Sequence, residues 1–314
     1  MSLQRLSITD FRIFQSIDLA LMPGMNLITG PNGSGKSSVV EAIYFLGHAR
    51  SFRSSTLAPI IADQAAGFHL FAELATESAG AVKIGLSRFR TQPPVHRFNG
   101  KNTSSALQIA QALPVIAFTP ETLMIRGAKS RIRLLDWVAF YHQSTFAKIW
   151  SSANALIKQR NAALKQHMSA SIVESFDQAL LPLCQQIDDI RQQCHDNFIP
   201  FFTQQCQQLL PDFLLTPHYL RGWSQHEELD QLWQKSLSND RRFGATSFGP
   251  HRADYCFKLG QKMADQVLSR GQQKLLMCAF KLAQVSYMLQ YTDQKPLVVF
   301  DDLPSELDEV NRNK

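Results

Sequence analysis

Residues 30–37 read Gly30-Pro31-Asn32-Gly33-Ser34-Gly35-Lys36-Ser37 and match the phosphate-binding P-loop pattern GxxxxGK[ST]. Small residues in such a loop let successive backbone N–H groups curl around phosphate oxygens, and the helix that follows adds its positive N-terminal end. The pattern predicts that Lys36 reaches the β- and γ-phosphates of a nucleotide and that the Ser37 hydroxyl binds Mg²⁺. The sequence therefore predicts ATP and Mg²⁺ as cofactors.

The segments around the loop have the periodicity of an α/β fold. Residues 25–29 form an apolar run that leads into the loop and are predicted to be a buried strand, and residues 38–47 are predicted to be a helix. Further strands are predicted over residues 3–8, 17–21, 68–75, 82–89 and 114–118, with a hairpin turn at 99–100.

The middle of the chain has a different pattern. From residue 131 to about 210, apolar residues recur in steps of three and four, which is typical of packed antiparallel helices, and a break near 169–171 predicts a helical hairpin. A short helix near 227–237, a long helix after Ser269 and a strand at 297–300 are predicted further on. We therefore expect an N-terminal head part over 1–120, an inserted helical lobe over 121–212 and a C-terminal head part over 213–314.

Two aspartates follow the apolar strand at 297–300. A P-loop needs a second metal ligand, normally an acid at the end of a hydrophobic strand, and Asp301 is predicted to supply it beside Ser37. Asp302 comes one residue later, where a carboxylate can orient or deprotonate an attacking water. Asp302 is therefore the candidate catalytic residue.

A third motif reads Leu268-Ser269-Arg270-Gly271-Gln272-Gln273-Lys274. Ser269 is a predicted helix N-cap, and Gly271 leaves backbone N–H groups open at the helix start. The stretch resembles the signature motif of ABC-type ATPases, and residues 305–308 are similar to their D-loop. The resemblance implies that Ser269, Gly271 and Gln272 bind, in trans, the ATP held by a partner's P-loop, and hence that the chain forms an ATP-dependent homodimer.

Other blocks spread over the chain resemble the bacterial RecF family. They are Phe11-Arg12, Ser51-Phe52-Arg53, Ala117-Phe118-Thr119-Pro120-Glu121, Leu135-Asp136-Trp137, Lys158-Gln159-Arg160-Asn161 and Gly249-Pro250-His251-Arg252-Ala253-Asp254. The resemblance implies an α/β fold, an ABC/SMC-type P-loop ATPase head with an inserted helical second lobe. It also implies ATP-dependent DNA binding at single-/double-strand junctions, a weak ATPase activity at most, and work with RecO and RecR in loading RecA during repair, replication-gap rescue and the SOS response.

Three features depart from the family pattern. Thr119-Pro120-Glu121 stands where ABC ATPases usually carry a Mg²⁺-sensing glutamine, so a sensor role is not predicted there. Asp302 occupies the usual glutamate position and shortens the candidate base by one methylene, which fits slow turnover. The chain ends at Lys314, soon after the D-loop-like residues, whereas the resemblance implies a further helix and strand with a switch residue. We therefore expect either that the sequence is a fragment or a truncated gene product, or that hydrolysis and stability are impaired.

The charge pattern suggests where DNA binds. A net charge of +6 permits a polyanionic partner without requiring one. Four cations near the start of the helical segment repel one another unless an anion offsets them, which makes them candidate contacts to DNA phosphates. These are Arg126, Lys129, Arg131 and Arg133, with Lys158, Arg160 and Lys165 as weaker candidates further along. His251 and Arg252 are expected to organise the strand before the signature.

The remaining composition excludes several classes. The five cysteines form no CxxC pair and are odd in number, which supports neither a disulfide framework nor a zinc site. No apolar run approaches the roughly 20 residues of a membrane span, so a cytoplasmic protein with no membrane contact is expected. A transporter subunit is disfavoured by the missing glutamine and the helical insertion. Another non-transport ABC ATPase, such as a phage-defence subunit, and an ATP-binding scaffold without turnover stay open as alternatives.

Overall fold

The computed structural model describes residues 2–76, 80–103, 105–124 and 127–302. The chain divides into two compact units. The first unit comprises Met1–Met124 and Met288–Lys314, and the second unit comprises Ile125–Tyr287. Each unit has its own sheet and its own helices, and each is described by itself below.

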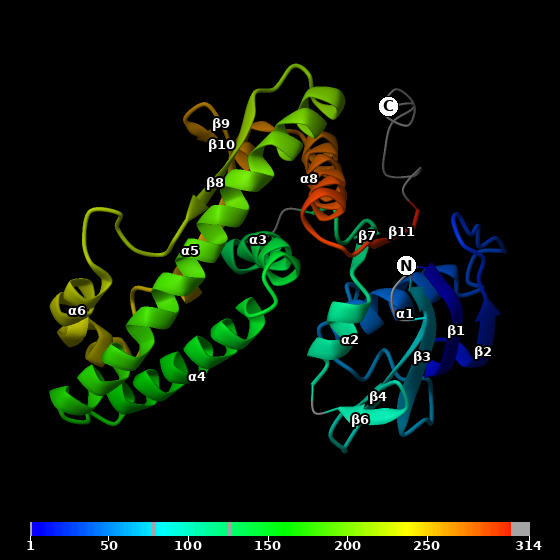
Figure 1. The fold of residues 1–314 in the computed structure, drawn as a ribbon, viewed down its shortest axis with the longest axis horizontal. Helices are drawn as coiled ribbons and strands as arrows, with labels where there is room; N and C mark the ends of the chain where they lie inside the picture. The colour runs from blue at the N-terminus through cyan, green and yellow to red at the C-terminus, as the bar shows by residue number, and fades with distance from the viewer. Residues whose placement is uncertain (1, 77–79, 104, 125–126, 303–314) are drawn as a thin grey trace. The chain divides into compact units, whose positions relative to one another are not determined.

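The first unit contains an antiparallel sheet and a parallel strand pair (Figure 1). The antiparallel sheet has the order β2-β1-β3-β4-β5-β6 and is built from β1 (Ser2–Phe11), β2 (Phe14–Ala20), β3 (Gly67–Thr76), β4 (Gly80–Phe89), β5 (Val95–Phe98) and β6 (Lys101–Thr103). The remaining elements are α1 (Lys36–His48), α2 (Leu107–Ala112), β7 (Val115–Phe118) and β11 (Leu297–Phe300). β7 and β11 pair in parallel, and neither pairs with another of the described strands.

The core of the first unit lies between one face of the antiparallel sheet and α1. On β4 the alternation of Val82, Ile84 and Leu86 places these side chains in the core, as the period of a half-buried strand predicts. The helix α1 is buried from Ser38 to Gly47 because it also packs against β7. A Cβ on Gly47 would lie 2.6 Å from a Val115 methyl carbon, so the absence of a side chain allows this close approach.

The predicted strand at residues 25–29 is wrong. These residues have no regular structure, and the side chains of Met25 and Leu27 are 95% and 84% exposed. Residues 25–29 are mostly apolar, but an apolar run becomes a buried strand only when a neighbouring strand pairs with it. No described strand of the first unit does so.

The second unit is a helical hairpin with a small sheet beside it. Its helices are α3 (Ala128–His142), α4 (Phe146–Lys165), α5 (Ala170–Leu209), α6 (Leu229–Phe243), the 3-10 turn η1 (Pro250–Arg252), α7 (Ala264–Val267) and α8 (Arg270–Tyr291). The strands β8 (Leu215–Leu220), β9 (Asp254–Leu259) and β10 (Lys262–Met263) form an antiparallel sheet of order β10-β9-β8. Helices α4 and α5 run side by side, which confirms the predicted hairpin and its break (Figure 1).

The second unit extends beyond the lobe expected from the sequence. The expected boundary at residue 212 assigned residues 213–314 to the head, but the compact unit continues to Tyr287. The physical reason is that β8 and β9 pack against α5 and α3, so the sheet after the hairpin shares a core with the hairpin. An aromatic cluster joins them, with Phe202 from α5, Phe257 from β9 and Phe280 from α8 in mutual ring contact.

Most of the other predicted elements are confirmed. The strands at 3–8, 17–21, 68–75, 82–89 and 114–118 correspond to β1, β2, β3, β4 and β7, and the strand at 297–300 is β11. The hairpin turn at Asn99-Gly100 joins β5 to β6, with both residues at positive φ (48° and 79°). Among the described residues, no helix is both long and apolar enough to cross a membrane.

Candidate functional site

The P-loop ends at the start of α1, and this helix start has an unusual form. Gly35 is its N-cap, with φ 94° in the left-handed region and no side-chain cap. The backbone N–H groups of a first helical turn have no partners within the helix, so Lys36 and Ser37 offer theirs to a ligand. A Cβ on Gly35 would lie 2.4 Å from Phe14 Cζ and 2.9 Å from Ile13 Cδ1. The turn between β1 and β2 therefore lies directly against the loop.

The lysine of the loop folds over the loop itself. Lys36 Nζ donates hydrogen bonds to the backbone carbonyls of Gly30 and Pro31, both at 2.8 Å. The residues from Gly30 to Ser34 are exposed. The structure thus places a lysine cation at an accessible loop whose helix start is uncapped.

The acidic strand meets the P-loop at a hydrogen bond. Ser37 Oγ donates to Asp301 Oδ1 at 2.9 Å, although the two residues are 264 positions apart in the chain. Asp301 is held there because β11 pairs with β7 and because its backbone N–H donates to the Phe118 carbonyl at 2.9 Å. Asp302 follows with φ 50°, a sharp turn of the chain directly after Asp301. The structure therefore brings together the two predicted metal ligands, Ser37 and Asp301.

The surroundings of Asp301 include two charged residues that the sequence analysis did not assign to the site. Burial raises the pKa of the Asp301 carboxyl, the Ser37 hydrogen bond opposes this, and nearby Asp302 and Glu121 raise it further while Arg53 lowers it. Arg53 Nε lies 3.7 Å from Glu121 Oε1. Both residues lie in blocks that resemble RecF, which was the only signal in the sequence that pointed to them.

Glu121 is fixed by its own segment. Thr119 Oγ1 donates to Glu121 Oε2 at 3.0 Å, and the Thr119 side chain is buried at the end of β7. The segment in which the sequence lacks the expected glutamine therefore carries the Glu121 carboxylate. This carboxylate lies close enough to Asp301 to raise its pKa.

A second set of charged contacts holds α1 through its residue Glu41. Glu41, fully buried in α1, accepts two hydrogen bonds from the Arg12 guanidinium at 2.9 and 2.6 Å and one from Ser51 Oγ at 2.5 Å. Burying a carboxylate costs free energy unless it is paired and hydrogen-bonded, and Arg12 and Ser51 supply those partners. These contacts explain two of the blocks that resemble RecF, since Arg12 and Ser51 fix the β1–β2 turn and residues 51–53 to the helix that begins with Lys36.

The signature motif lies at the start of α8 and forms a capping box. The Gln272 backbone N–H donates to Ser269 Oγ at 3.3 Å, and the Ser269 backbone N–H donates to Gln272 Oε1 at 2.8 Å. This confirms Ser269 as an N-cap. Ser269, Arg270 and Gly271 are exposed. The D-loop-like residues 305–308 lie outside the described residues.

Some of the residues predicted to contact DNA are exposed, and others are buried in ion pairs. The Arg131 guanidinium donates to both carboxylate oxygens of Asp254, at 2.9 and 2.6 Å, and is largely buried, so it is not a phosphate contact as predicted. Arg160 is likewise fully buried and pairs with Asp177 and Asp240 at 2.5 and 2.7 Å. Arg126 lies outside the described residues. The exposed cations that remain from the two sets are Lys129, Arg133, Lys158 and Lys165.

His251 and Arg252 have a structural role. His251 Nε2 and the Arg252 guanidinium all bond to the Thr246 carbonyl, at distances from 3.0 to 3.1 Å. Burial lowers the pKa of His251. Asn161 Oδ1 accepts from the Thr246 N–H at 2.7 Å, so α4 and the segment before β9 are joined at this threonine. The expectation that these residues organise the strand before the signature is consistent with these bonds.

The cysteines behave as small buried residues. All five are free and buried, and burial raises the pKa of Cys184, Cys194 and Cys206 to about 12 and that of Cys278 to about 11. No cluster of three or more His, Cys, Asp or Glu side chains suited to a metal occurs among the residues that the structure describes.

Comparison with known proteins gives consistent matches along the whole chain. Residues 2–314 match the family described as RecF/RecN/SMC N terminal domain. The chain is 39% identical over 315 residues to the DNA replication and repair protein RecF of Erwinia tasmaniensis, covering 100% of this chain and 87% of that relative. It is 38% identical over 314 residues to the protein of the same name from Klebsiella pneumoniae, covering 99% and 88%.

Solved structures agree with this assignment. The chain is similar to the recombination mediator protein RecF described with ATPrS in the RecFOR pathway, with a TM-score of 0.87, 25% identity, and coverage of 100% of this chain and 88% of that one. RecF described with ATP gives a TM-score of 0.91 at 24% identity, covering 99% and 87%. An Smc head bound to the C-winged helix domain of ScpA shares the fold more distantly, with a TM-score of 0.55 at 15% identity. The predicted fold class, an ABC/SMC-type α/β head, is confirmed.

Proposed function

The chain belongs to the RecF family, and we propose from this premise that it is an ATP-dependent DNA-binding protein of recombinational repair and replication. ATP binds at the P-loop, and two copies dimerise on it. The relatives carry the name DNA replication and repair protein, and structures of RecF with ATP and with ATPrS share the fold. Binding is the main role, and hydrolysis is weak.

The observation that carries this proposal is the contact between Ser37 and Asp301. A hydroxyl and a carboxylate oxygen 2.9 Å apart at the start of α1 are the oxygen ligands that Mg²⁺ prefers beside a nucleotide. Ser37 and Asp301 would hold the ion, which supplies charge neutralisation to the bound phosphates. Burial raises the pKa of the Asp301 carboxyl, and a cation bound beside it would favour the charged carboxylate.

The nucleotide phosphates bind to the loop through this chain's own groups. The N–H groups at the start of α1 face an anion without competition from a side-chain cap, and Lys36 supplies the cation. Gly33 and Gly35, at φ 82° and 94°, give the loop the curvature that other residues adopt only with strain. Asp302 is proposed to position the attacking water.

The signature is proposed to bind the γ-phosphate of a partner copy through Ser269, Gly271 and Gln272. The glycine supports this assignment, because a Cβ on Gly271 would meet no atom within 4 Å. Nothing within the described part of the chain therefore requires a glycine in the first turn of α8. Close approach of a second molecule would require it, because a side chain there would separate the partner's nucleotide from the helix N–H groups.

DNA is proposed to bind through its phosphates, since a protein acting at gaps has no sequence to read. Lys129 and Arg133 are the exposed members of the original cation cluster that the structure describes. RecO and RecR are the proposed partners in loading RecA at junctions of single- and double-stranded DNA, by analogy with the RecFOR pathway named for the structural relatives.

The experiment that tests this function measures dimerisation and DNA binding with and without ATP over a salt series. We expect ATP to promote both, DNA binding to weaken steeply with salt, and Lys36→Ala to abolish the ATP effect. A dimer that persists in Lys36→Ala, or DNA binding that ignores ATP, would contradict the proposal.

Hydrolysis is tested separately from binding. For Asp302→Asn we expect ATP affinity and dimerisation to persist while turnover falls, because the amide cannot accept a proton. Unchanged turnover would remove the proposed role of Asp302. If the unaltered protein binds ATP and dimerises without measurable turnover, the alternative of an ATP-binding scaffold is correct.

A further inference from the structure

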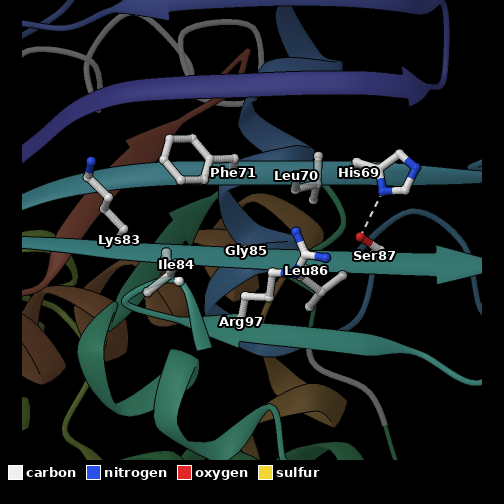
Figure 2. Close-up of a pocket in the computed structure, with 10 residues that line it drawn as sticks. His69, Leu70, Phe71, Lys83, Ile84, Gly85, Leu86, Ser87 and Arg97 are labelled. Carbon is white, nitrogen blue, oxygen red and sulfur yellow. Dashed lines mark hydrogen bonds between the residues drawn. The ribbon is translucent and has the colours of Figure 1, made fainter. Parts of the chain in front are cut away.

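A hollow of about 390 Å³ lies on the outer face of the antiparallel sheet in the first unit. Figure 2 shows it centred on Gly85 of β4, with Phe71 of β3 and Arg97 of β5 on either side. Along the strands, Lys83 borders one end, and His69 with Ser87 borders the other. The α1 side of the sheet is the opposite face, so the hollow is separate from the P-loop.

The register of the strands explains why a hollow forms there. Phe71 pairs with Gly85, and Gly85 pairs with Arg97, so a glycine stands between an aromatic and a cationic side chain in one row across the sheet. Strands lie about 4.8 Å apart, which puts the two flanking backbones roughly 10 Å from each other. A planar ring can therefore enter between them above the glycine.

Two cationic side chains, Lys83 and Arg97, line the hollow, and no carboxylate among the described residues lines it. Lys83 Nζ lies 3.1 Å from Glu73 Oε1 and so has a carboxylate partner. Arg5, which is paired with Asp18, has its Cζ 6.0 Å from the centre of the Phe71 ring. Arg97 differs from Lys83 and Arg5, because its Nε donates to an amide oxygen, Asn102 Oδ1, at 3.3 Å, and no carboxylate among the residues that the structure describes forms an ion pair with it.

We propose that this hollow binds an unpaired nucleobase of single-stranded DNA, stacked on Phe71 above Gly85, with the adjoining phosphates held by Arg97 and Lys83. Aromatic side chains on a sheet surface beside cations are a usual platform for unpaired bases, Phe71 is partly exposed, and the hollow has the volume of a small-ligand site. The inference rests on the proposed DNA-binding function and adds a site for the single-stranded part of a junction.

Two residues allow the hollow to be closed or emptied without disturbing the core. Gly85 has ordinary strand geometry, and a Cβ there would lie 3.5 Å from Arg97 Cβ and 3.8 Å from the Leu70 carbonyl oxygen, which is normal contact. Gly85→Val therefore fills the hollow while favouring the strand. Phe71→Ala removes the stacking surface and no charge.

The test measures binding of a labelled single-stranded oligothymidylate of about 15 nucleotides by fluorescence anisotropy, with the whole chain and ATP. We expect about a tenfold loss of affinity for Phe71→Ala and for Gly85→Val, since stacking accounts for that much per base. With an abasic strand of the same length, Phe71→Ala should have no effect. Arg97→Gln should weaken binding of both strands and reduce the salt slope by about 0.7.

The controls separate this inference from the proposed function. Lys262→Gln removes one exposed charge from β10 in the second unit and should leave oligothymidylate binding unchanged. All hollow variants should keep the ATP affinity of the unaltered protein. Equal losses for abasic strand and oligothymidylate with Phe71→Ala, or none with either, would overturn the inference while leaving ATP-dependent DNA binding intact. Displacement by free thymidine monophosphate at a matching base concentration would also overturn it, because the site would then be one for mononucleotides. Absence of DNA binding by the unaltered protein would overturn both.

Discussion

The two helix starts on which the nucleotide prediction depends are built in opposite ways. In the first unit, α1 follows Gly35 and has no side-chain cap. In the second unit, α8 follows Ser269, which forms a capping box with Gln272. An uncapped start is stabilised when an anion binds, whereas in the capping box of α8 the Ser269 and Gln272 N–H groups already have partners. The N–H groups at the P-loop therefore obtain their partners only when a ligand binds. The signature is already held by its own side chains before a ligand contacts it.

The largest effect is expected at the open start. In Gly35→Ala, a Cβ clashes with Phe14 and the residue must keep φ 94°, which together cost about 3 kcal/mol and weaken ATP binding about a hundredfold. Titration with a fluorescent ATP analogue measures the loss. Gly33→Ala is the matched control, because φ is 82° there but nothing lies within 4 Å, so it should show only the strain of about 1 kcal/mol. Equal effects for both variants would contradict the clash.

The next effect is expected at the capped start. Ser269→Asp keeps a good N-cap, so the stability of the protein should be unchanged, but its negative charge should oppose a partner's γ-phosphate and weaken ATP-dependent dimerisation about tenfold or more. Ser269→Ala loses the cap, at a cost of about 1 kcal/mol, and serves to separate stability from dimerisation. Analytical ultracentrifugation with ATP distinguishes them. If Ser269→Asp dimerises normally, the contact in trans is wrong.

Acidification should destabilise the second unit more than the first unit. Burial lowers the pKa of His142, His195, His218 and His251 in the second unit and of His96 in the first. The unfolded state therefore binds protons first as the pH falls below about 6.5, and the stability present above that pH is lost toward the lower folded-state pKa values. We expect the melting temperature to fall by a few degrees between about pH 7.5 and pH 5.5.

A histidine variant isolates this effect. Burial raises the pKa of Asp177 and Asp188, so these carboxyls act in the opposite direction and lose stability as the pH rises above about 4. Comparing His251→Gln with the unaltered protein cancels their contribution. The variant should show a shallower fall in melting temperature, and an identical slope would exclude His251 as a contributor.

The smallest effect is expected at Gly271. Because a Cβ there meets open space in a helix, Gly271→Ala should raise the free energy of unfolding by up to about 1 kcal/mol. The same change should weaken ATP-dependent dimerisation. Denaturant unfolding and sedimentation measure the two quantities, and a variant with both unchanged stability and unchanged dimerisation would leave the glycine without a role.

Local patterns predicted the parts of the fold that depend on local chemistry. The P-loop, the helical hairpin and the cap at Ser269 follow from residues within one turn or one strand of each other, and each is found where the pattern predicts it. The strand at 25–29 depended instead on a partner strand, which apolar periodicity does not encode. The boundary at 212 failed for a similar reason, since the sheet after the hairpin shares the hairpin's core.

Long-range ion pairs set the limit for the candidate site. Arg131 and Asp254 are 123 residues apart, so a cluster of like charges in the sequence gave no sign that one of them was already neutralised. Arg53 and Glu121 are likewise far from Asp301 in the sequence, and folding brings them close enough to affect its pKa. Residue type predicted which chemistry was available, and only the structure showed which groups had already been used.

The pairing of β7 with β11 also has a consequence for how the chain folds while the ribosome is still making it. All four residues of β7 are buried, yet β11 and Asp301 follow only after the whole second unit has been made. At about 5–20 residues per second, the P-loop serine waits roughly 10–50 s for its aspartate. During that interval an apolar strand edge is uncovered, so the nascent head is most prone to aggregation or chaperone capture while the second unit is emerging.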